Sequence, residues 1–205
     1  MTKSDRPLRA DAARNRAKVL EVAYEVFAAE GLAVPIDEIA RRAGVGAGTV
    51  YRHFPTKEAL FEAVIEDRVQ RIVGIGRELL STVGPERALF AFLREVAVTS
   101  AVDHGLMDAL AGYGIDVAEA APGSEAAFLG VVDELLTSAQ RAGAVRPDVG
   151  VAEVKALLVV CKTSQGYGDD ISERVVTVIE DGLRARPSLH SPRSSAKNAV
   201  GTRDQ

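Results

Sequence analysis

Cysteine, tryptophan and long apolar runs are scarce or missing in this sequence. The 205 residues include one cysteine, Cys161, and no tryptophan. A single cysteine cannot form an intramolecular disulfide, and the paired Cys and His spacings of a zinc site are absent. No run approaches the roughly 18 apolar residues of a membrane-spanning helix, and the N-terminus MTKSDRPLRADAARNRAK is too polar for a secretory signal. We therefore expect a cytoplasmic protein that needs no metal, cofactor or membrane.

Charge is distributed unevenly along the chain. The formal net charge is -4, yet residues 1–60 hold ten Lys and Arg against eight Asp and Glu, whereas residues 61–205 hold fifteen against twenty-one. Because a DNA duplex attracts Lys and Arg, the N-terminal third is compatible with a polyanionic partner. We expect residues 1–10 to form a flexible basic arm in which Arg6 and Arg9 assist DNA binding. A solvated tail without a function is the alternative.

Apolar residues recur at helical spacing through most of the chain, and no run alternates long enough for a convincing strand. The expected fold class is all-α, with about nine helices. Capping and turn residues predict helices at about 12–30, 35–43, 47–53, 57–80, 86–101, 103–112, 124–142, 149–165 and 170–185. From Pro187 onward almost no large apolar residue occurs, so this end is expected to be disordered.

The most informative segment is IDEIARRAGVGAGTVYRHF, residues 36–54. Two short helices are predicted to join through Ala43-Gly44-Val45, where the glycine supplies the tight turn and the valine fills the angle between the helices. This is the geometry of a helix-turn-helix, whose second helix enters the DNA major groove. The segment therefore predicts DNA binding.

The sequence resembles the TetR family of transcriptional regulators over residues 14–65. The resembling stretches are RAKVLEVAYEVFAAEG, IDEIARRAGVGAGTVYRHF and PTKEALFEAV, in the order typical of that family. The resemblance implies an N-terminal three-helix DNA-binding domain, a linking fourth helix, and a C-terminal helical bundle for ligand binding and dimerisation. We accordingly assign residues 11–56 to the DNA-binding domain, 57–186 to the regulatory and dimerisation domain, and 187–205 to a disordered tail.

By the same resemblance, the second short helix carries the DNA contacts. Tyr51, His53 and Lys57 match phosphate contacts, whose donors fix register without reading sequence. Tyr51 could instead pack its ring into the small core, and His53 could be an ordinary surface histidine. The expected DNA-binding residues are Gly46, Ala47, Gly48, Thr49, Tyr51, Arg52, His53 and Lys57.

We predict that few side chains of the second short helix read base edges directly. Where the family commonly has serine and then a polar residue such as lysine, this chain has Gly46-Ala47, without a side-chain donor. Ala47 can touch a thymine methyl, Thr49 a base or a phosphate, and Arg52 a base or only solvent. We therefore expect more help than usual from the basic arm or from DNA shape.

The C-terminal part contains no His-x-x-x-His pair on a helix and no Gly-x-Ser-x-Gly elbow, so it offers no catalytic set. The resemblance implies a cavity here for an unknown small-molecule effector. Candidate lining residues include adaptable or polar side chains, although most are equally good core residues. The candidates are Met107, Tyr113, Phe128, Gln165, Phe90, Leu110 and Cys161.

The predicted helices at about 149–165 and 170–185 carry apolar stripes that include Val154, Val159, Val178 and Leu183. Such stripes fit the core of one chain or, by resemblance, an interface with a second copy. The sequence thus predicts a homodimeric repressor on a palindromic double-stranded DNA operator, with half-sites about 34–36 Å apart, released by an effector.

Two other functions are alternatives. An effector-independent regulator or activator would use the C-terminal bundle only to dimerise. A nucleotide-cofactor enzyme is a remote alternative, suggested by Gly44-Val-Gly46-Ala-Gly48. A dinucleotide-binding loop needs a preceding strand and a third glycine at another offset, whereas residues 36–43 are predicted to be helical and position 49 is threonine. We therefore predict no enzymatic activity.

Overall fold

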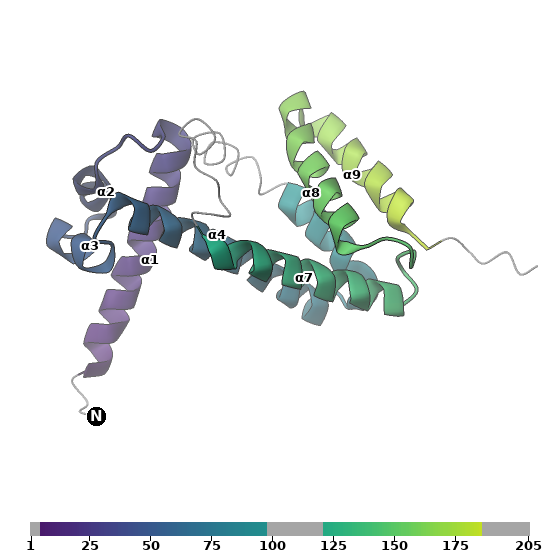
Figure 1. The fold of residues 1–205 in the computed structure, drawn as a ribbon, viewed down its shortest axis with the longest axis horizontal. Helices are drawn as coiled ribbons and strands as arrows, with labels where there is room; N and C mark the ends of the chain where they lie inside the picture. Colours follow the sequence, from purple (N-terminus) through teal and green to yellow (C-terminus); the bar gives the residue numbers. More distant parts are fainter. Residues whose placement is uncertain (1–4, 98–120, 186–205) are drawn as a thin grey trace, which may run out of the picture.

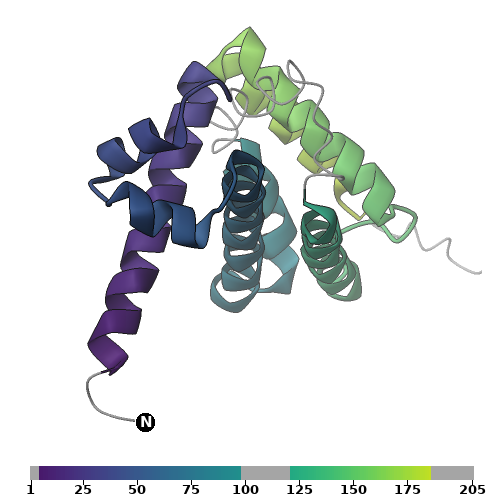
Figure 2. The ribbon, with the colours of Figure 1, turned by 60° about the vertical axis from the view of Figure 1, so that its left-hand side comes forward.

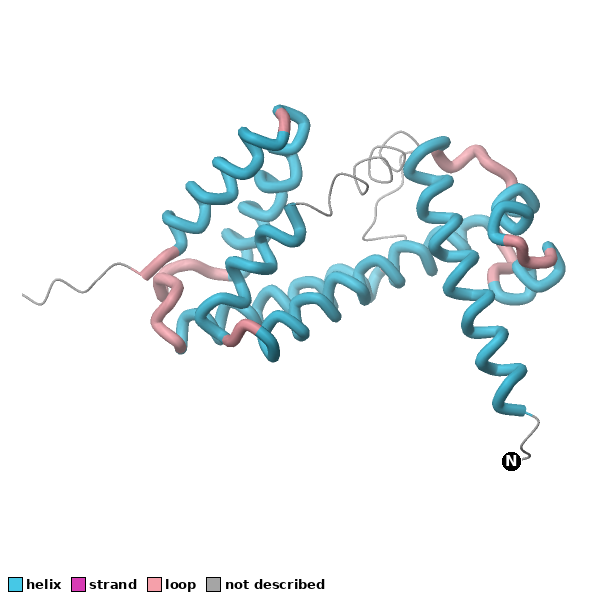
Figure 3. The backbone as a smooth tube through the Cα atoms, turned by 180° about the vertical axis from the view of Figure 1, so that it is seen from behind, coloured by secondary structure: helices cyan, strands magenta, loops and turns pink. Residues whose placement is uncertain are grey.

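The computed structural model describes residues 5–97 and 121–185. Within these ranges the chain is helical apart from short loops, as Figures 1 and 3 show, and the only pairing of strand type is one bridge between Val145 and Arg184. The all-α prediction is confirmed for this part of the chain. The helix predicted at 103–112 and the tail predicted from residue 187 lie outside the described residues.

The first four helices form the N-terminal part of the molecule. They are α1 (Asp5–Glu30), α2 (Ile36–Ala43), α3 (Ala47–His53) and α4 (Lys57–Thr82). Their shared core is aromatic and aliphatic: Phe27 and Ile39 are fully buried, and the rings of Phe27 and Phe61 lie 6.0 Å apart between centroids. This core fixes the two short helices against the two long ones.

The first helix begins earlier than predicted. It starts at Asp5 instead of near Ala12, so residues 5–10 are helical where we expected a flexible arm. Pro7 permits this because it falls in the first turn, where backbone N–H groups have no acceptor within the helix. Alanines at positions 10, 12, 13 and 17 also favour the helix.

The fourth helix connects the two halves of the molecule. Leu60 and Val64, near its start, belong to the N-terminal core, whereas Val73 belongs to a second core, and Val69 packs against both. Helix α7 (Pro122–Arg141) lies alongside the second half of α4 (Figures 1 and 2). The two halves are therefore joined by a continuous rod.

The second core is closed by a helical segment at 85–97, by α7, and by the hairpin of α8 (Val151–Ser164) and α9 (Asp169–Leu183). A single 3₁₀ turn, η1 (Gln165–Tyr167), and Gly168 with φ of 98° reverse the chain between α8 and α9. These bounds agree within two residues with the predicted helices at 124–142, 149–165 and 170–185.

Candidate DNA-binding interface

The corner between α2 and α3 is set by Gly44. This residue has φ 63° and ψ 32°, a left-handed conformation that costs an L-residue with a side chain about 1–2 kcal/mol. The N–H of Gly44 donates to the carbonyl of Arg41 (3.1 Å), and that of Val45 donates to Ala40 (3.0 Å). The predicted corner is confirmed. The glycine ends a helix, so the preceding strand that a dinucleotide-binding loop needs is absent here.

Burial on one side of each short helix determines which side is exposed. In α2, the buried residues are Ile36, Ile39, Ala40 and Ala43. In α3, Val50 is buried, and Phe54 directly after the helix is buried too. Because these side chains anchor both helices to the core, the remaining sides of α3 lie in solvent.

The predicted DNA-binding residues occupy that solvent side. Gly46, Ala47 and Gly48 are exposed at the start of α3, and Thr49 is half-buried. Tyr51 is 44 % exposed, so its ring is not part of the small core. Arg52 and His53 are exposed as well. These residues, which are neighbours in the sequence, thus form one exposed surface, with small residues at its start and hydrogen-bond donors at its end.

Lys57 follows at the start of α4. Thr56 caps this helix, since its hydroxyl oxygen accepts from the N–H of Ala59 at 3.1 Å, as its position before the helix predicts. Partial burial lowers the pKa of Lys57. The cap and the buried Phe54 together fix the position of the Lys57 backbone, from which the side chain with its ammonium group extends.

Two basic residues of α1 also lie beside the helix-turn-helix, which we did not predict. The guanidinium carbon of Arg16 lies 5.5 Å from the ring centroid of Phe54. The Nζ atom of Lys18 lies 3.5 Å from where a Cβ on Gly44 would be. Both contacts join residues that are far apart in the sequence, so sequence patterns do not predict them directly. Only Arg16 had a local indication, because position 16 shares the 3–4 spacing of the buried face of α1.

The cations of α2 are neutralised locally. Arg41 donates twice to the carboxylate of Glu38, at 2.7 Å each, and Arg42 bonds both Glu38 and Glu30. These hydrogen bonds lower the pKa of Glu38 to about 2. The network ties the end of α1 to α2, and it leaves these two arginines less available to a polyanion than the residues of α3.

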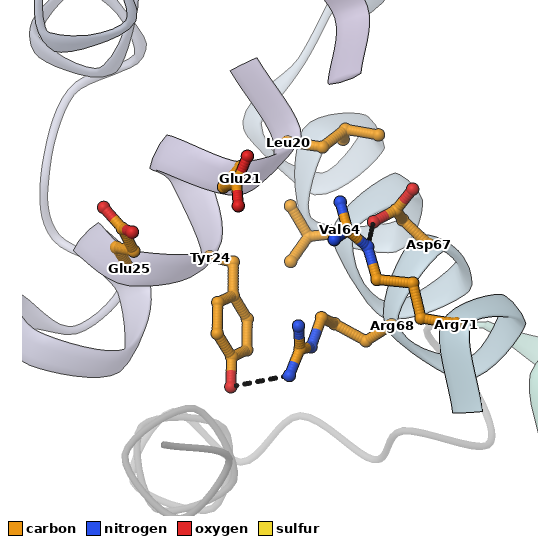
Figure 4. Close-up of a pocket in the computed structure, with 8 residues that line it drawn as sticks. All are labelled: Leu20, Glu21, Tyr24, Glu25, Val64, Asp67, Arg68 and Arg71. Carbon is orange, nitrogen blue, oxygen red and sulfur yellow. Dashed lines mark hydrogen bonds and ion pairs between the residues drawn. The ribbon is translucent and has the colours of Figure 1, made fainter. Parts of the chain in front are cut away.

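A cavity of about 130 Å³ separates α1 from α4 (Figure 4). On one side the Arg68 guanidinium lies 4.0 Å from the Tyr24 ring centroid and donates to its hydroxyl at 3.3 Å. Nearby, Nε of Arg71 donates to Asp67 at 2.8 Å. Of the predicted effector contacts, those in the described ranges do not line this cavity. The contact of Arg68 with Tyr24 instead links α4 to α1.

The predicted effector-contact residues have varied positions. Phe90 and Cys161 are buried in the second core, against which the partly buried Phe128 packs. Burial raises the pKa of the Cys161 thiol to about 11. Gln165 is half-buried at the end of α8, in η1. The remaining candidates, Met107, Leu110 and Tyr113, lie outside the described residues.

The described ranges contain no group of three metal-binding side chains. Likewise, none of the helices between residues 5 and 97 or 121 and 185 is long and apolar enough to cross a bilayer.

Family models match both halves of the chain. Residues 19–64 match the model of bacterial regulatory proteins of the tetR family. Residues 84–185 match the C-terminal domain of SbtR-like transcriptional regulators. The first match covers the helix-turn-helix and the second covers the C-terminal helices.

Solved structures and curated relatives agree with these matches. A TetR transcription regulatory protein from Mycobacterium vanbaalenii is 66 % identical, with a TM-score of 0.74, over 87 % of this chain and 99 % of that one. The regulator SCO0520 from Streptomyces coelicolor is 34 % identical, with a TM-score of 0.69, over 84 % and 99 %.

The HTH-type transcriptional regulator SrpR from Pseudomonas putida is 42 % identical over 60 residues, which are 29 % of this chain and 28 % of SrpR. The match to curated relatives therefore spans less than a third of their length. Near-complete coverage of the homologous structures, together with the helix-turn-helix at Gly44, establishes that the chain belongs to the TetR family of transcriptional regulators.

Proposed function

We propose that this protein is a repressor that binds a palindromic DNA operator as a homodimer and releases it when a small-molecule effector binds. The observation that carries the proposal is the exposed surface of α3, presented from a rigid corner at Gly44. In this proposal residues 11–56 bind DNA and residues 57–186 regulate and dimerise, with α4 as the connection between them.

The residues of the exposed surface have distinct proposed roles. The hydroxyl of Tyr51, the imidazole of His53 and the ammonium of Lys57 donate to phosphate oxygens and set the register. Thr49 contacts a base or a phosphate. Gly46, Ala47 and Gly48 carry at most a methyl group, so we propose that the duplex backbone and base edges approach them closely. Arg52 then supplies the longest side chain available for reading a base edge.

Selection of bound duplexes from a random library tests the DNA-binding part and identifies the operator. On the selected duplex, Tyr51→Phe should weaken binding on the order of tenfold, because a hydrogen bond to a charged phosphate is lost. Ser81→Ala removes an exposed hydroxyl near the end of α4, outside the DNA-binding and dimer surfaces, and should bind as the parent does. Equal affinities for all three proteins, or no duplex enriched at all, would refute this role.

The homodimer is supported by the apolar side chains that the single chain leaves in solvent. Among the described residues, six large apolar side chains are exposed, and only Tyr51 lies in the DNA-binding part. The other five lie on α8, η1 and α9: Val159, Val160, Tyr167, Ile171 and Val178. A two-fold pairing of this hairpin would remove them from water and match a palindromic operator.

The effector response is supported by one buried polar atom at the end of α8. The side-chain oxygen of Gln165 is buried and accepts no hydrogen bond from the described residues, so it is available to a polar group of a ligand. With it we propose Phe90, Phe128, Cys161, Met107, Leu110 and Tyr113 as contacts. A panel of small molecules tests this by thermal shift and by operator release, where a coupling of about 1–3 kcal/mol corresponds to roughly 5–150-fold weaker DNA binding.

An effector-independent regulator or activator is the second candidate, since the exposed apolar surface of α8 and α9 requires only a dimer. The same panel separates the two functions. A compound that binds the protein and lowers its operator affinity favours the ligand-responsive repressor. Operator binding that no compound changes, together with a reporter gene that stays silent or is activated, favours the alternative.

A further inference from the structure

The first half of α1 extends beyond the protein core. From residue 11 onward, where side chains are described, Val19 is the first buried residue of this helix, and residues 13–18 are all exposed. The helix nevertheless continues to Asp5, and Figures 1 and 3 show it running past α2 and α3. A short helix with few tertiary contacts is marginally stable in water, so a partner on its exposed side would stabilise this extension.

One face of α1 changes from apolar residues in the core to basic residues in the extension. In the core, Leu20, Ala23 and Phe27 follow each other at spacings of three and four and are buried. The same spacing continues backwards through positions 16, 13, 9 and 6, which hold Arg16, Ala13, Arg9 and Arg6. We name these four residues the Arg face. The apolar side of α1 thus becomes a row of mainly arginine positions where the helix extends beyond the core.

The Arg face begins next to the DNA-binding surface. Arg16 lies against Phe54, the residue that ends α3, and Lys18 lies at the Gly44 corner. Positions 6 and 16 are ten residues apart, or about 15 Å along a helix at 1.5 Å per residue. Since base pairs in B-DNA are about 3.4 Å apart, this length corresponds to about four base pairs of one strand.

We infer that the Arg face is a second DNA-contacting surface, which binds the phosphate backbone flanking the groove occupied by α3. The inference rests on the proposed DNA binding and adds a partner for α1. Charge complementarity favours this occupant, because residues 1–20 carry Lys3, Arg6, Arg9, Arg14, Arg16 and Lys18 against only Asp5 and Asp11. The small side chain of Ala13, between Arg9 and Arg16, leaves room for a close approach of the DNA backbone.

Salt-dependent binding tests the Arg face, because phosphate contacts release counterions. The full chain is titrated onto a fluorescent duplex of random sequence at increasing NaCl concentrations. The slope of log K against log salt should become shallower by about 0.9 for Arg16→Ala and about 1.8 for Arg9→Ala/Arg16→Ala. The affinity difference from the parent should shrink as salt rises.

Two further variants control for charge and packing. Arg87→Ala removes a cation from an exposed position of the segment at 85–97 and should keep the parent slope. Arg16→Lys keeps the charge but not the planar group over Phe54, and it should also keep the slope. Arg16→Lys and Arg16→Ala could instead lose DNA affinity and salt slope equally, with lower melting temperatures. That result would mean that Arg16 only packs on Phe54, and it would overturn the phosphate role of Arg16.

The outcomes separate this inference from the proposed function. If the parent binds the duplex and the double variant binds with the same slope, the Arg face does not contact DNA, while the role of α3 stands. If the parent itself does not bind any duplex, the proposed function fails and this inference fails with it.

Discussion

At the scale of single residues, two glycines of α4 occupy opposite environments. A Cβ on Gly76 would lie 2.6 Å from Cγ2 of Val131, closer than packed atoms approach, and 3.3 Å from Cδ1 of Leu135, a tight contact. A Cβ on Gly74 would have no atom within 4 Å. Helix α7 therefore packs directly against α4 at Gly76, whereas Gly74 is open to solvent.

Alanine at these two positions should have effects of opposite sign. Gly76→Ala should lower the free energy of unfolding by about 1–3 kcal/mol, because an overpacked core must shift. Gly74→Ala should raise it by up to about 1 kcal/mol, because alanine is the better helix former. Urea unfolding of both variants at one protein concentration checks this. A shift of the two midpoints in the same direction would contradict the close contact of α4 and α7.

A single carboxylate also predicts a pH dependence. The pKa of Glu38 is lowered from 4.5 to about 2 by hydrogen bonds from Arg41 and Arg42. A carboxylate with a lowered folded-state pKa stabilises the fold fully above its unfolded pKa, and this contribution is lost as the pH falls through the folded value. Glu38→Gln should therefore melt at a lower temperature than the parent near neutral pH, and the gap should close between pH 4.5 and 2.

Melting curves of the parent and variant across this pH range check the prediction. Glu62→Gln makes the same chemical change at an exposed position of α4 and reports the background. A gap between parent and Glu38→Gln that stays constant down to pH 2 would show that the network around Glu38 does not stabilise the fold.

At the scale of helices, the helix-turn-helix could be predicted almost to the residue. Gly44 must end α2, and Thr56 can only cap a helix that follows it, so local chemistry determines these ends. The start of α1 was missed although Ser4, a residue type favoured before a helix, directly precedes Asp5 in the sequence and Pro7 is compatible with a first turn. Local rules work where the backbone itself is constrained.

The apolar stripes of α8 and α9 show where local rules fail. Val154 and Leu183 are buried in the second core, whereas Val159 and Val178 are 58 % and 70 % exposed. These residues are of one chemical type, and which of them the chain covers depends on where α7 and the segment at 85–97 pack. Spacing alone therefore left monomer core and dimer interface as alternatives. The position of Lys18 at the Gly44 corner was beyond prediction for the same reason.

Helix α9, which carries part of the exposed apolar surface, is joined to the segment at 85–97 by an ion pair. Nη2 of Arg94, in the segment at 85–97, donates to the buried Glu180 of α9 at 2.7 Å. Arg94→Ala would leave this carboxylate buried without its cation. We expect a loss of about 1–3 kcal/mol, less than for a fully buried pair because Arg94 is itself 47 % exposed.

Urea unfolding measures the Arg94→Ala loss, and Arg87→Ala, from an exposed position of the same segment, is the control. Equal stability of the two variants would show that the Arg94–Glu180 pair contributes nothing to holding α9.

At the scale of the whole molecule, the exposed hairpin predicts the state of assembly. Val178→Glu places a charge in the proposed interface and should convert a dimer of about twice 21.7 kDa into a monomer, as light scattering after size exclusion would measure. Ala126→Glu puts the same charge on an exposed position of α7 and should remain dimeric. A monomeric parent, or a dimeric Val178→Glu, would contradict this interface.

Loss of the dimer should also weaken operator binding, because each chain then holds only one half-site. Val178→Glu should bind a single half-site as the parent does but lose its preference for the complete palindrome. The same loss of affinity on both duplexes would indicate a damaged fold instead.

The proposed repressor must place α3 in a DNA groove, and directed cleavage from this helix tests that placement. Cys161 is buried, with its pKa raised to about 11, so Ala47→Cys can be labelled selectively with an iron–EDTA group. On the selected duplex, strand cleavage should centre on two major-groove sites about one helical turn, or a multiple of it, apart. Labelled Ala126→Cys should leave these sites intact. Cleavage absent from both variants, or identical in both, would contradict the placement of α3 in the groove.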